Sequence, residues 1–342
     1  MDKNQDTTRQ EFADGADVPK QSFPARLRRS CVRFWWLYFF SFVALVLVIV
    51  LPIVYVGYPT LAQKTINRSA ITLNSYAIRH PTPSSFDLGI DYTILSNSSN
   101  HANLDSYNAS LYLPASENSF VTFEVPAVKS GKATDVSIDQ NVTIDLPEEL
   151  VKFCMIALES DTYDLNVRGR GGLKLGSLPR TSVKYNKTVQ SKGLNKLKGF
   201  NITRFSLLQD TGPFNANAEG QVMIPNPSEI TLDAGNVTAT MRVADTLIGN
   251  VTLPDLTLKP GNETYTMYAT TNQTAVGGLL QQSAYRCGVL PLDVTPDQSV
   301  YDGQMIPYLT TALRAATLRV DLDVGPALAE AGFGALIPDD CR

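Results

Sequence analysis

The sequence has very little histidine and cysteine, with two histidines and four cysteines among 342 residues. Histidine is the side chain that most often transfers protons near neutral pH, so its scarcity leaves few candidates for acid–base catalysis. His80 precedes a proline and His101 lies in an Asn-rich polar segment, so both are predicted to be solvated surface residues. The common zinc, serine-hydrolase and Cys-x-x-Cys signatures are also missing. We therefore predict a non-enzymatic protein without catalytic residues, metal ligands or a cofactor.

A strong charge of one sign is missing as well. The formal net charge is −4, and no basic stripe runs through the segment after residue 57. Nucleic-acid binding is therefore disfavoured. The run Gly169-Arg-Gly-Gly shares its glycines with phosphate-binding loops, but no Gly-Lys-Ser/Thr follows it. It predicts a hairpin turn.

Acidic residues offer two further chemical hypotheses. Asp321 and Asp323 would share one face of a strand, but Ca²⁺ prefers six to eight oxygen ligands and no third carboxylate is in register, so a solvated strand face is predicted. A glycosidase-type pair among Glu159, Asp161 and Asp164 stays open, because the separation between carboxylates is not visible in a sequence.

One long uncharged run is present, from Phe34 to Val56. As a helix its 23 residues would span ~34 Å, enough to cross the hydrocarbon core of a bilayer. A cleaved signal peptide would have a shorter apolar region nearer the start. The basic residues before the run predict a cytosolic N-terminus; they are Arg26, Arg28, Arg29 and Arg33. We therefore predict a single-pass type II membrane protein, with residues 1–33 as a disordered cytosolic tail and 34–56 as a signal-anchor helix.

Glycosylation sequons are frequent after this run. Ten Asn-x-Ser/Thr motifs occur there, whereas composition alone gives about three by chance. The excess predicts a glycosylated lumenal or extracellular surface. The candidate residues are Asn67, Asn97, Asn108, Asn141, Asn186, Asn201, Asn236, Asn250, Asn262 and Asn272.

The four cysteines divide between the two sides of the predicted membrane. Cys31 lies on the reduced side next to the span, where it is a candidate for palmitoylation, with an unmodified thiol as the alternative. The other three face an oxidising compartment, so at most one internal disulfide can form. We predict the pair Cys287–Cys341, which ties the C-terminus to the last domain, because Cys154 lies in an apolar run that is predicted to be buried.

Alternation of apolar and polar residues dominates the exported part and predicts half-buried strands. The clearest runs are Asn108–Leu113, Asp135–Leu146, Thr162–Arg168, Asn236–Val243 and Thr317–Val324. Each sequon asparagine in these runs falls on the polar face. Three stretches have a more helical pattern, and they are Pro147–Glu159, Thr274–Cys287 and Ile306–Ala315.

A module repeats at a spacing of about 128 residues. Asn108 corresponds to Asn236, and each is followed 18 residues later by a proline; Phe86 is matched with Phe214. Strands punctuated by Gly, Pro and Asn predict a mainly β protein, in which one N-terminal transmembrane helix precedes two tandem antiparallel β-sandwich domains with short helices. The predicted boundaries are 57–79 for a stalk or linker, 80–192 for the first module and 193–342 for the second.

The layout, together with Ile-Pro-Asn-Pro at 224–227 and the stretch from Val251-Thr-Leu-Pro to Thr271-Asn-Gln-Thr, resembles a known family. These are fungal single-pass membrane proteins of unknown function whose lumenal modules are similar to late-embryogenesis-abundant type 2 (WHy) domains. The resemblance covers about residues 60–340 and extends to vacuolar proteins of yeasts that help terminate autophagy. It implies LEA type 2-like modules, a vacuolar or secretory-pathway location, and lipid binding.

We therefore expect lumenal modules that bind lipid or a protein partner at the vacuolar membrane, with the cell surface as the alternative location. The expected lipid site is an apolar cleft between splayed sheets. The runs Leu150–Leu158 and Val276–Leu280 are expected to cover or line it, and the alternative is that they only cap the core. Two other functions stay open: a structural or protein-interaction ectodomain, in membrane tethering or in vacuole or autophagy regulation, and a glycan-acting hydrolase.

Overall fold

A computed structural model describes residues 35–96, 102–129 and 131–341. The chain divides into two compact units, Met1–Tyr58 and Pro59–Arg342. In the first unit, helix α2 (Trp35–Pro52) continues into a π-helical turn (Ile53–Gly57). Within the described ranges, one helix is long and apolar enough to cross a membrane. It agrees with the predicted span, whereas the predicted tail 1–33, with Cys31, lies outside the described residues.

The second unit begins with α3 (Tyr58–Arg68) and then consists mostly of strands. Its first half contains one further helix. The elements are β1 (Ala70–Arg79), β2 (Ser85–Leu95), β3 (Ala102–Leu104), β4 (Tyr107–Tyr112), β5 (Ser119–Val125), β6 (Val128–Lys129), β7 (Ala133–Thr143), α4 (Pro147–Glu159), β8 (Thr162–Leu175) and β9 (Thr181–Lys192).

The second half has longer strands and three short α-helices. The elements are β10 (Asn201–Leu207), β11 (Ala218–Asn226), β12 (Ile230–Val243), β13 (Thr246–Leu258), β14 (Gly261–Thr271), α5 (Gln273–Leu280), β15 (Val289–Tyr301), β16 (Gln304–Met305), α6 (Pro307–Arg314), β17 (Leu318–Asp323) and α7 (Gly325–Glu330). Short 3₁₀ turns lie at Asn195–Leu197, Pro213–Asn215, Gly334–Leu336 and Asp339–Cys341.

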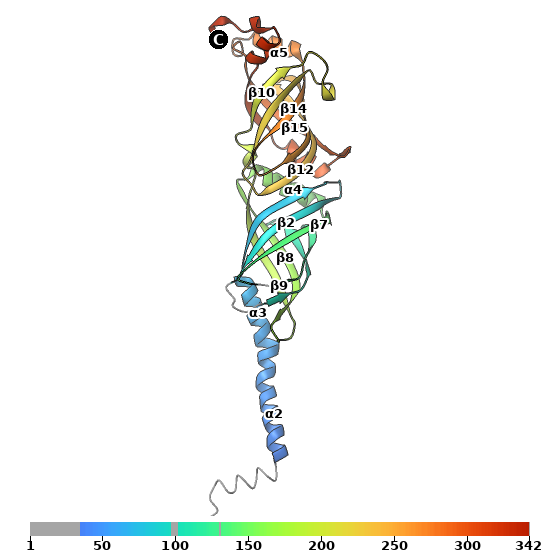
Figure 1. The fold of residues 1–342 in the computed structure, drawn as a ribbon, viewed down its shortest axis with the longest axis vertical. Coiled ribbons are helices and arrows are strands. Elements are labelled where there is room, and N and C mark those ends of the chain that lie inside the picture. Colours follow the sequence, from blue (N-terminus) through green and yellow to red (C-terminus); the bar gives the residue numbers. More distant parts are fainter. Residues whose placement is uncertain (1–34, 97–101, 130, 342) are drawn as a thin grey trace, which may run out of the picture. The chain divides into compact units, whose positions relative to one another are not determined.

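The first half is a β-sandwich. Antiparallel strands β1, β2 and β7 form one layer, and β5, β4, β8 and β9, with β3 and β6, form the other. In β7 the residues of the apolar face are buried and those between them are exposed, as the alternation predicts. Apolar side chains of both layers meet in one hydrophobic core. Figure 1 shows β2 and β7 side by side, with β8 and β9 in the other layer.

The order of strand pairing occurs twice. In the second half β10, β11 and β14 pair as β1, β2 and β7 do, and β13, β12, β15 and β17 pair as β5, β4, β8 and β9 do. The repeat deduced from Asn108 and Asn236 places both residues in equivalent strands, β4 and β12. The match of Phe86 with Phe214 is wrong, because Phe86 is buried in β2 whereas Phe214 is half-exposed in a 3₁₀ turn.

The two halves share a sheet and their cores. Residues 76–78 of β1 pair in parallel with residues 230–232 of β12, which joins β1, β2 and β7 to the strands of the second half in one 11-stranded sheet. Ile306 and Tyr308, at the start of α6, pack in the core of the first half, and Leu158 of α4 packs in the core of the second. The boundary between modules at residues 192 and 193 therefore stays a prediction.

The predicted fold class is confirmed as mainly β, with sandwich-like sheets after an apolar N-terminal helix. Helix α4 has the bounds predicted from the sequence, and α6 lies within its predicted segment. Helix α5 begins one residue before the predicted segment 274–287 and ends inside it. Two local predictions were wrong. The stretch 57–79 contains α3 and the paired strand β1 in place of a linker, and Gly169-Arg-Gly-Gly lies inside β8, so the turn comes at Gly176 instead.

Candidate functional site

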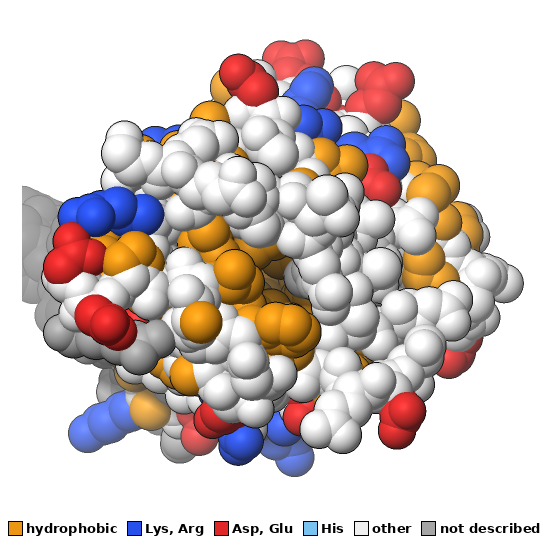
Figure 2. All heavy atoms as spheres, turned by 90° about the horizontal axis from the view of Figure 1, so that it is seen from above, with side chains coloured by type: hydrophobic (Ala, Val, Ile, Leu, Met, Phe, Trp, Pro, Cys, Tyr) orange, Lys and Arg blue, Asp and Glu red, His pale blue; other side chains and the backbone are white. Residues whose placement is uncertain are grey.

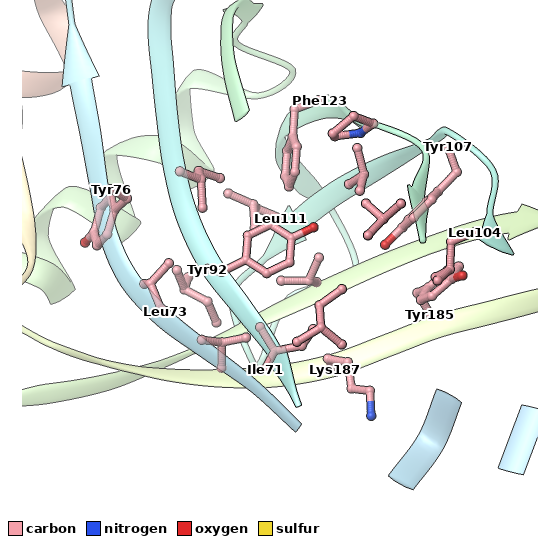
Figure 3. Close-up of a pocket in the computed structure, with 18 of the residues that line it drawn as sticks. Ile71, Leu73, Tyr76, Tyr92, Leu104, Tyr107, Leu111, Phe123, Tyr185 and Lys187 are labelled. Atoms are coloured by element: carbon pink, nitrogen blue, oxygen red, sulfur yellow. The ribbon is translucent and has the colours of Figure 1, made fainter. Parts of the chain in front are cut away.

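A cavity runs between the two layers of the first half. It contains about 1570 Å³ of empty space, part of which is open to solvent. The layers contact each other on both sides of it, β5 against β7 and β1 against β9. Its wall is apolar and aromatic (Figure 3), and the lining includes Ile71, Leu73, Tyr76, Ile78, Phe86, Leu88, Ile90, Tyr92, Ile94, Leu104, Tyr107, Leu111, Phe123, Leu150, Phe153, Leu165, Val167, Leu173, Tyr185, Lys187 and Val189.

Alternation along β2 supplies one wall of the first cavity. Leu88, Ile90, Tyr92 and Ile94 lie on the same face of the strand and line the cavity, while the intervening Asp91 is exposed. Lining residues occur from Phe86 to Ile94, so the cavity follows β2 for eight residues, ~26 Å at ~3.3 Å per residue. The cavity is therefore long compared with its width between two sheets.

One end of the first cavity is formed by α3 and the start of β1. Thr65, Ile66 and Ser69 contribute to the lining there. Helix α3 is fastened to β9 through Gln63, which donates a hydrogen bond to the carbonyl of Lys184 (2.8 Å) and accepts one from its N–H (2.9 Å). The Gln63 side chain therefore makes with β9 the two backbone hydrogen bonds that a neighbouring strand would make, and it holds α3 at the end of the cavity.

Among the described residues that line the first cavity, Lys187 is the only charged one. It occupies the inward-facing row of β9, between Tyr185 and Val189. Its Nζ donates to the carbonyl oxygens of Asn67 (2.9 Å) and Ser69 (2.5 Å), at the C-terminal end of α3, where a cation is favourable. Partial burial lowers the pKa of this ammonium group.

A stacked tyrosine pair forms the wall near this end. The rings of Tyr107 and Tyr185 lie 4.2 Å apart, and burial raises the pKa of both phenols. Gly169 and Gly171 of β8 allow Tyr107 to lie flat on the strand, because an added Cβ would approach its ring to 2.8 and 3.1 Å. The hydroxyl of Tyr185 is buried and finds no hydrogen-bond partner in the described part of the chain. It is an unpaired buried polar group on a residue that lines a mostly apolar cavity.

The predicted glycosylation residues lie on the surface. Of the nine that the structure describes, eight are exposed, whereas Asn236 is half-buried and accepts a hydrogen bond from the Asp255 N–H (3.0 Å). Asn97 lies outside the described residues. Eight of these side chains can therefore carry a glycan without disturbing the core, and glycosylation itself stays a prediction.

The structure contains the predicted disulfide between Cys287 and Cys341, which are 54 positions apart in the sequence. Cys154 on α4 is a free thiol and half-buried. Burial raises its pKa to about 12, so it remains protonated and unreactive at neutral pH.

The acidic and histidine residues considered above are scattered. Glu159, Asp161 and Asp164 are exposed and line none of the cavities described here, and Asp321 and Asp323 are exposed on β17. The exposed His80 pairs with Asp87 (2.8 Å), and His101 lies outside the described residues. Among the described residues, no group of three or more His, Cys, Asp or Glu side chains is placed to hold a metal ion.

Sequence reasoning identified the type of site but few of its residues. Leu150 and Phe153, from one of the two expected runs, line the first cavity; Val276 and Leu280, from the other run, line a separate cavity in the second half. The walls from β1, β2 and β9 were missed. A lysine in the inward row of an alternating strand, as Lys187 is, was a signal that could have pointed to them.

The fold and the cavity define a class: a β-sandwich protein with an internal apolar cavity, preceded by an apolar helix. A family model described as a protein of unknown function (DUF3712) matches residues 118–241. Among solved structures, a structural-genomics target, SoR45, is 13% identical, with 36% of this chain and 83% of that chain covered and a TM-score of 0.22. A bacterial adhesin from Mobiluncus mulieris is 11% identical, with 74% and 96% covered and a TM-score of 0.20. No curated protein sequence matches the chain. Structural likeness this low carries no functional argument.

Proposed function

We propose that this chain is a non-enzymatic, membrane-anchored protein that binds a lipid in the first cavity. The observation that carries the proposal is the distribution of polar groups. The described lining is almost entirely hydrocarbon and aromatic, and its one charged side chain, Lys187, lies at the end formed by α3, with the unpaired hydroxyl of Tyr185 two positions earlier on β9. A lipid has the complementary distribution, with one polar end and a long apolar body.

The dimensions of the first cavity support the same proposal. An acyl chain occupies about half of the ~30 Å hydrocarbon core of a bilayer. The ~26 Å that the cavity follows along β2 is therefore long enough for a whole chain. Transfer of each methylene group out of water contributes about 0.8 kcal/mol, so a chain gains much by entering. Native interiors usually contain few voids larger than a water molecule, so packing alone does not account for this cavity.

The connection to the apolar helix supplies a source of lipid. Val56, at the end of the predicted span, and Thr65 in the cavity lining are nine positions apart in the sequence. Even a fully extended chain of that length spans only about 32 Å. The α3 end of the cavity is therefore tethered within that distance of the membrane, which supports a membrane lipid as the ligand.

The proposal includes the topology deduced from the sequence. We propose a single-pass type II protein with a cytosolic N-terminus and a glycosylated lumenal body, at the vacuolar membrane or, alternatively, at the cell surface. The exposure of eight sequon asparagines supports the glycosylated body. The vacuolar location rests on the family resemblance alone.

A matched pair of tryptophan variants tests lipid binding. Leu73 lines the first cavity, and its neighbour Thr72 is exposed on the opposite face of β1. We expect L73W to fill the cavity and T72W to add the same bulk outside it. Full-length protein, purified in detergent from the membranes that produced it, would be analysed for co-purifying lipid by native mass spectrometry.

Wild type and T72W should retain one lipid per chain after extensive washing, and L73W should lose most of it. Lipid held by the apolar helix contributes equally to both variants, because the helix is the same in both. The comparison of L73W with T72W therefore removes that contribution. Equal retention by L73W and T72W, or an empty wild-type protein that takes up no added lipid, would favour a structural or protein-binding ectodomain instead.

A further inference from the structure

The second half contains two further apolar cavities. One, the second cavity, has about 1220 Å³ of empty space between the strands of the second half, and the third cavity has about 930 Å³ beside α5 and α7. Tyr76, Ile78 and Phe153 line both the first and the second cavity. Met241 lines both the second and the third. Neighbouring cavities therefore share parts of their walls, through Tyr76, Ile78 and Phe153 in one case and Met241 in the other.

The second cavity is almost without polar groups. Its lining contains no charged residue, and its polar atoms are the Cys154 thiol and the Tyr76 hydroxyl, which is already hydrogen-bonded to the hydroxyl of Tyr163. A charged headgroup that entered it would lose its hydration without gaining a partner, at a cost of several kcal/mol. Hydrocarbon meets no such barrier, and the desolvation cost of a single uncharged hydroxyl is smaller than that of a charged headgroup.

The third cavity opens at the far end of the second half. Phe333 and Leu336 belong to its lining and are 56% and 51% exposed, so this apolar site reaches the surface. Figure 2, viewed onto the end of the molecule that carries α5, shows a hollow with hydrophobic side chains around it. The only polar lining residues are Thr271 and Gln273.

We propose that the three cavities act in series, as one conduit for a lipid without a charged headgroup, such as diacylglycerol or a sterol, from the α3 end to the opening at Phe333 and Leu336. The proposal rests on lipid binding in the first cavity. Met241 is an unbranched, flexible side chain, so the second partition can open by rotamer changes without breaking a hydrogen bond. The apolar lining of the second cavity selects against phospholipids, which stop in the first cavity.

Photocrosslinking in the full-length protein tests the conduit. The protein would be reconstituted into phosphatidylcholine vesicles that contain a diacylglycerol with a diazirine in its acyl chain, or a phosphatidylcholine with the same label. After illumination, labelled peptides would be mapped by mass spectrometry. In the wild type we expect diacylglycerol to label peptides of all three cavities and phosphatidylcholine to label those of the first only.

Two variants on β12 distinguish lipid that reaches the third cavity through the second from lipid that enters the third cavity directly from outside. Ala239 is buried and lines the second cavity only, whereas Thr240 faces away from it. We expect A239F to keep labelling in the first cavity and to reduce labelling of β17 and α7 at least tenfold, with T240F unchanged. If A239F also loses first-cavity labelling through misfolding, A312F on α6 blocks the same cavity from the other wall.

The outcomes distinguish the two proposals. An absence of labelling in the first cavity of the wild type would overturn lipid binding and the conduit together. Labelling confined to the first cavity would leave lipid binding intact and overturn the conduit. Undiminished diacylglycerol labelling of β17 and α7 in the blocked variants, or equal labelling there by phosphatidylcholine, would also overturn it.

Discussion

At the scale of single residues, the space available at individual backbone positions decides which side chains can form the cavity wall. Gly169 lies where an added Cβ would come within 2.8 Å of the Asn108 carbonyl oxygen, so this strand position needs glycine. The sequence pattern of clustered glycines predicted a turn, because glycine is common in turns. The clustered glycines instead allow the aromatic ring of Tyr107 to pack closely against β8. Tyr107 lies more than 60 positions earlier in the chain.

An ion pair on the outer face of the second half provides a residue-scale prediction. Arg319 on β17 donates to both carboxylate oxygens of Asp293 on β15 (2.8 and 2.9 Å), and these bonds lower the pKa of the Asp293 carboxyl. Its stabilisation is therefore complete above the unfolded-state value of about 3.8 and is lost as the pH falls through the lower folded-state pKa. We expect D293N to lower the free energy of unfolding at pH 7 by less than about 1 kcal/mol, because the pair is partly exposed.

Urea unfolding of the lumenal body between pH 2 and 7 measures this effect. The difference between wild type and D293N should shrink as the pH falls below 4. A difference that stays constant down to pH 2 would show that the carboxylate charge is not its cause.

At the scale of elements, the ends of the second unit are tied down by different means. Helix α3 is held by the two hydrogen bonds between Gln63 and β9. The last turns of the chain lack a long helix or strand and are closed by the Cys287–Cys341 disulfide. The segment between α7 and Cys341 carries Phe333 and Leu336 of the third cavity. The disulfide therefore belongs to the structure of that opening.

Removal of this disulfide should destabilise the protein and loosen the opening. A crosslink that closes a loop of 54 residues contributes about 4 kcal/mol in the chain-entropy model, and native disulfides measure about 2–5 kcal/mol. We expect the double variant C287S/C341S to unfold at lower urea concentration by a corresponding amount and to exchange its C-terminal amide hydrogens faster. Because Cys154 is free and half-buried, C154S is the control and should change stability by much less. Equal losses of stability in C287S/C341S and in C154S would contradict the assignment of the disulfide to Cys287 and Cys341.

At the scale of the whole molecule, the two repeated halves depend on each other. The first residues of β12, 230–232, pair in parallel with residues 76–78 of β1. Ile306, Tyr308 and Leu309 of the second half are buried in the core of the first. Tandem modules that evolve by repetition often keep separate cores, but these contacts bridge the repeat boundary. The sequence predicted the repeat because its marks are local, such as the spacing from sequon to proline.

Truncation tests this dependence. We expect residues 59–342 to unfold in one cooperative transition, and residues 193–342 alone to lack one, because β12 loses its parallel partner and buried apolar residues become exposed. Thermal denaturation followed by near-ultraviolet circular dichroism distinguishes these outcomes. A cooperative transition of 193–342 by itself would establish it as an independent domain with the boundary predicted from the sequence.

The sequence by itself determined the features that follow from nearest neighbours along the chain. The length of the uncharged run predicted the apolar helix, and the alternation of apolar and polar residues predicted the strands. The helical pattern that begins at Pro147 predicted both ends of α4. The tertiary structure alone decided the pairing of β1 with β12, the place of Gly169 within a strand, and the cavities. These features join residues that are far apart in the sequence. Their energies come from packing between the faces of strands and helices. Periodicity along the sequence predicts which face points inward but not which residues meet across the core, so no local pattern encodes the size of the cavities.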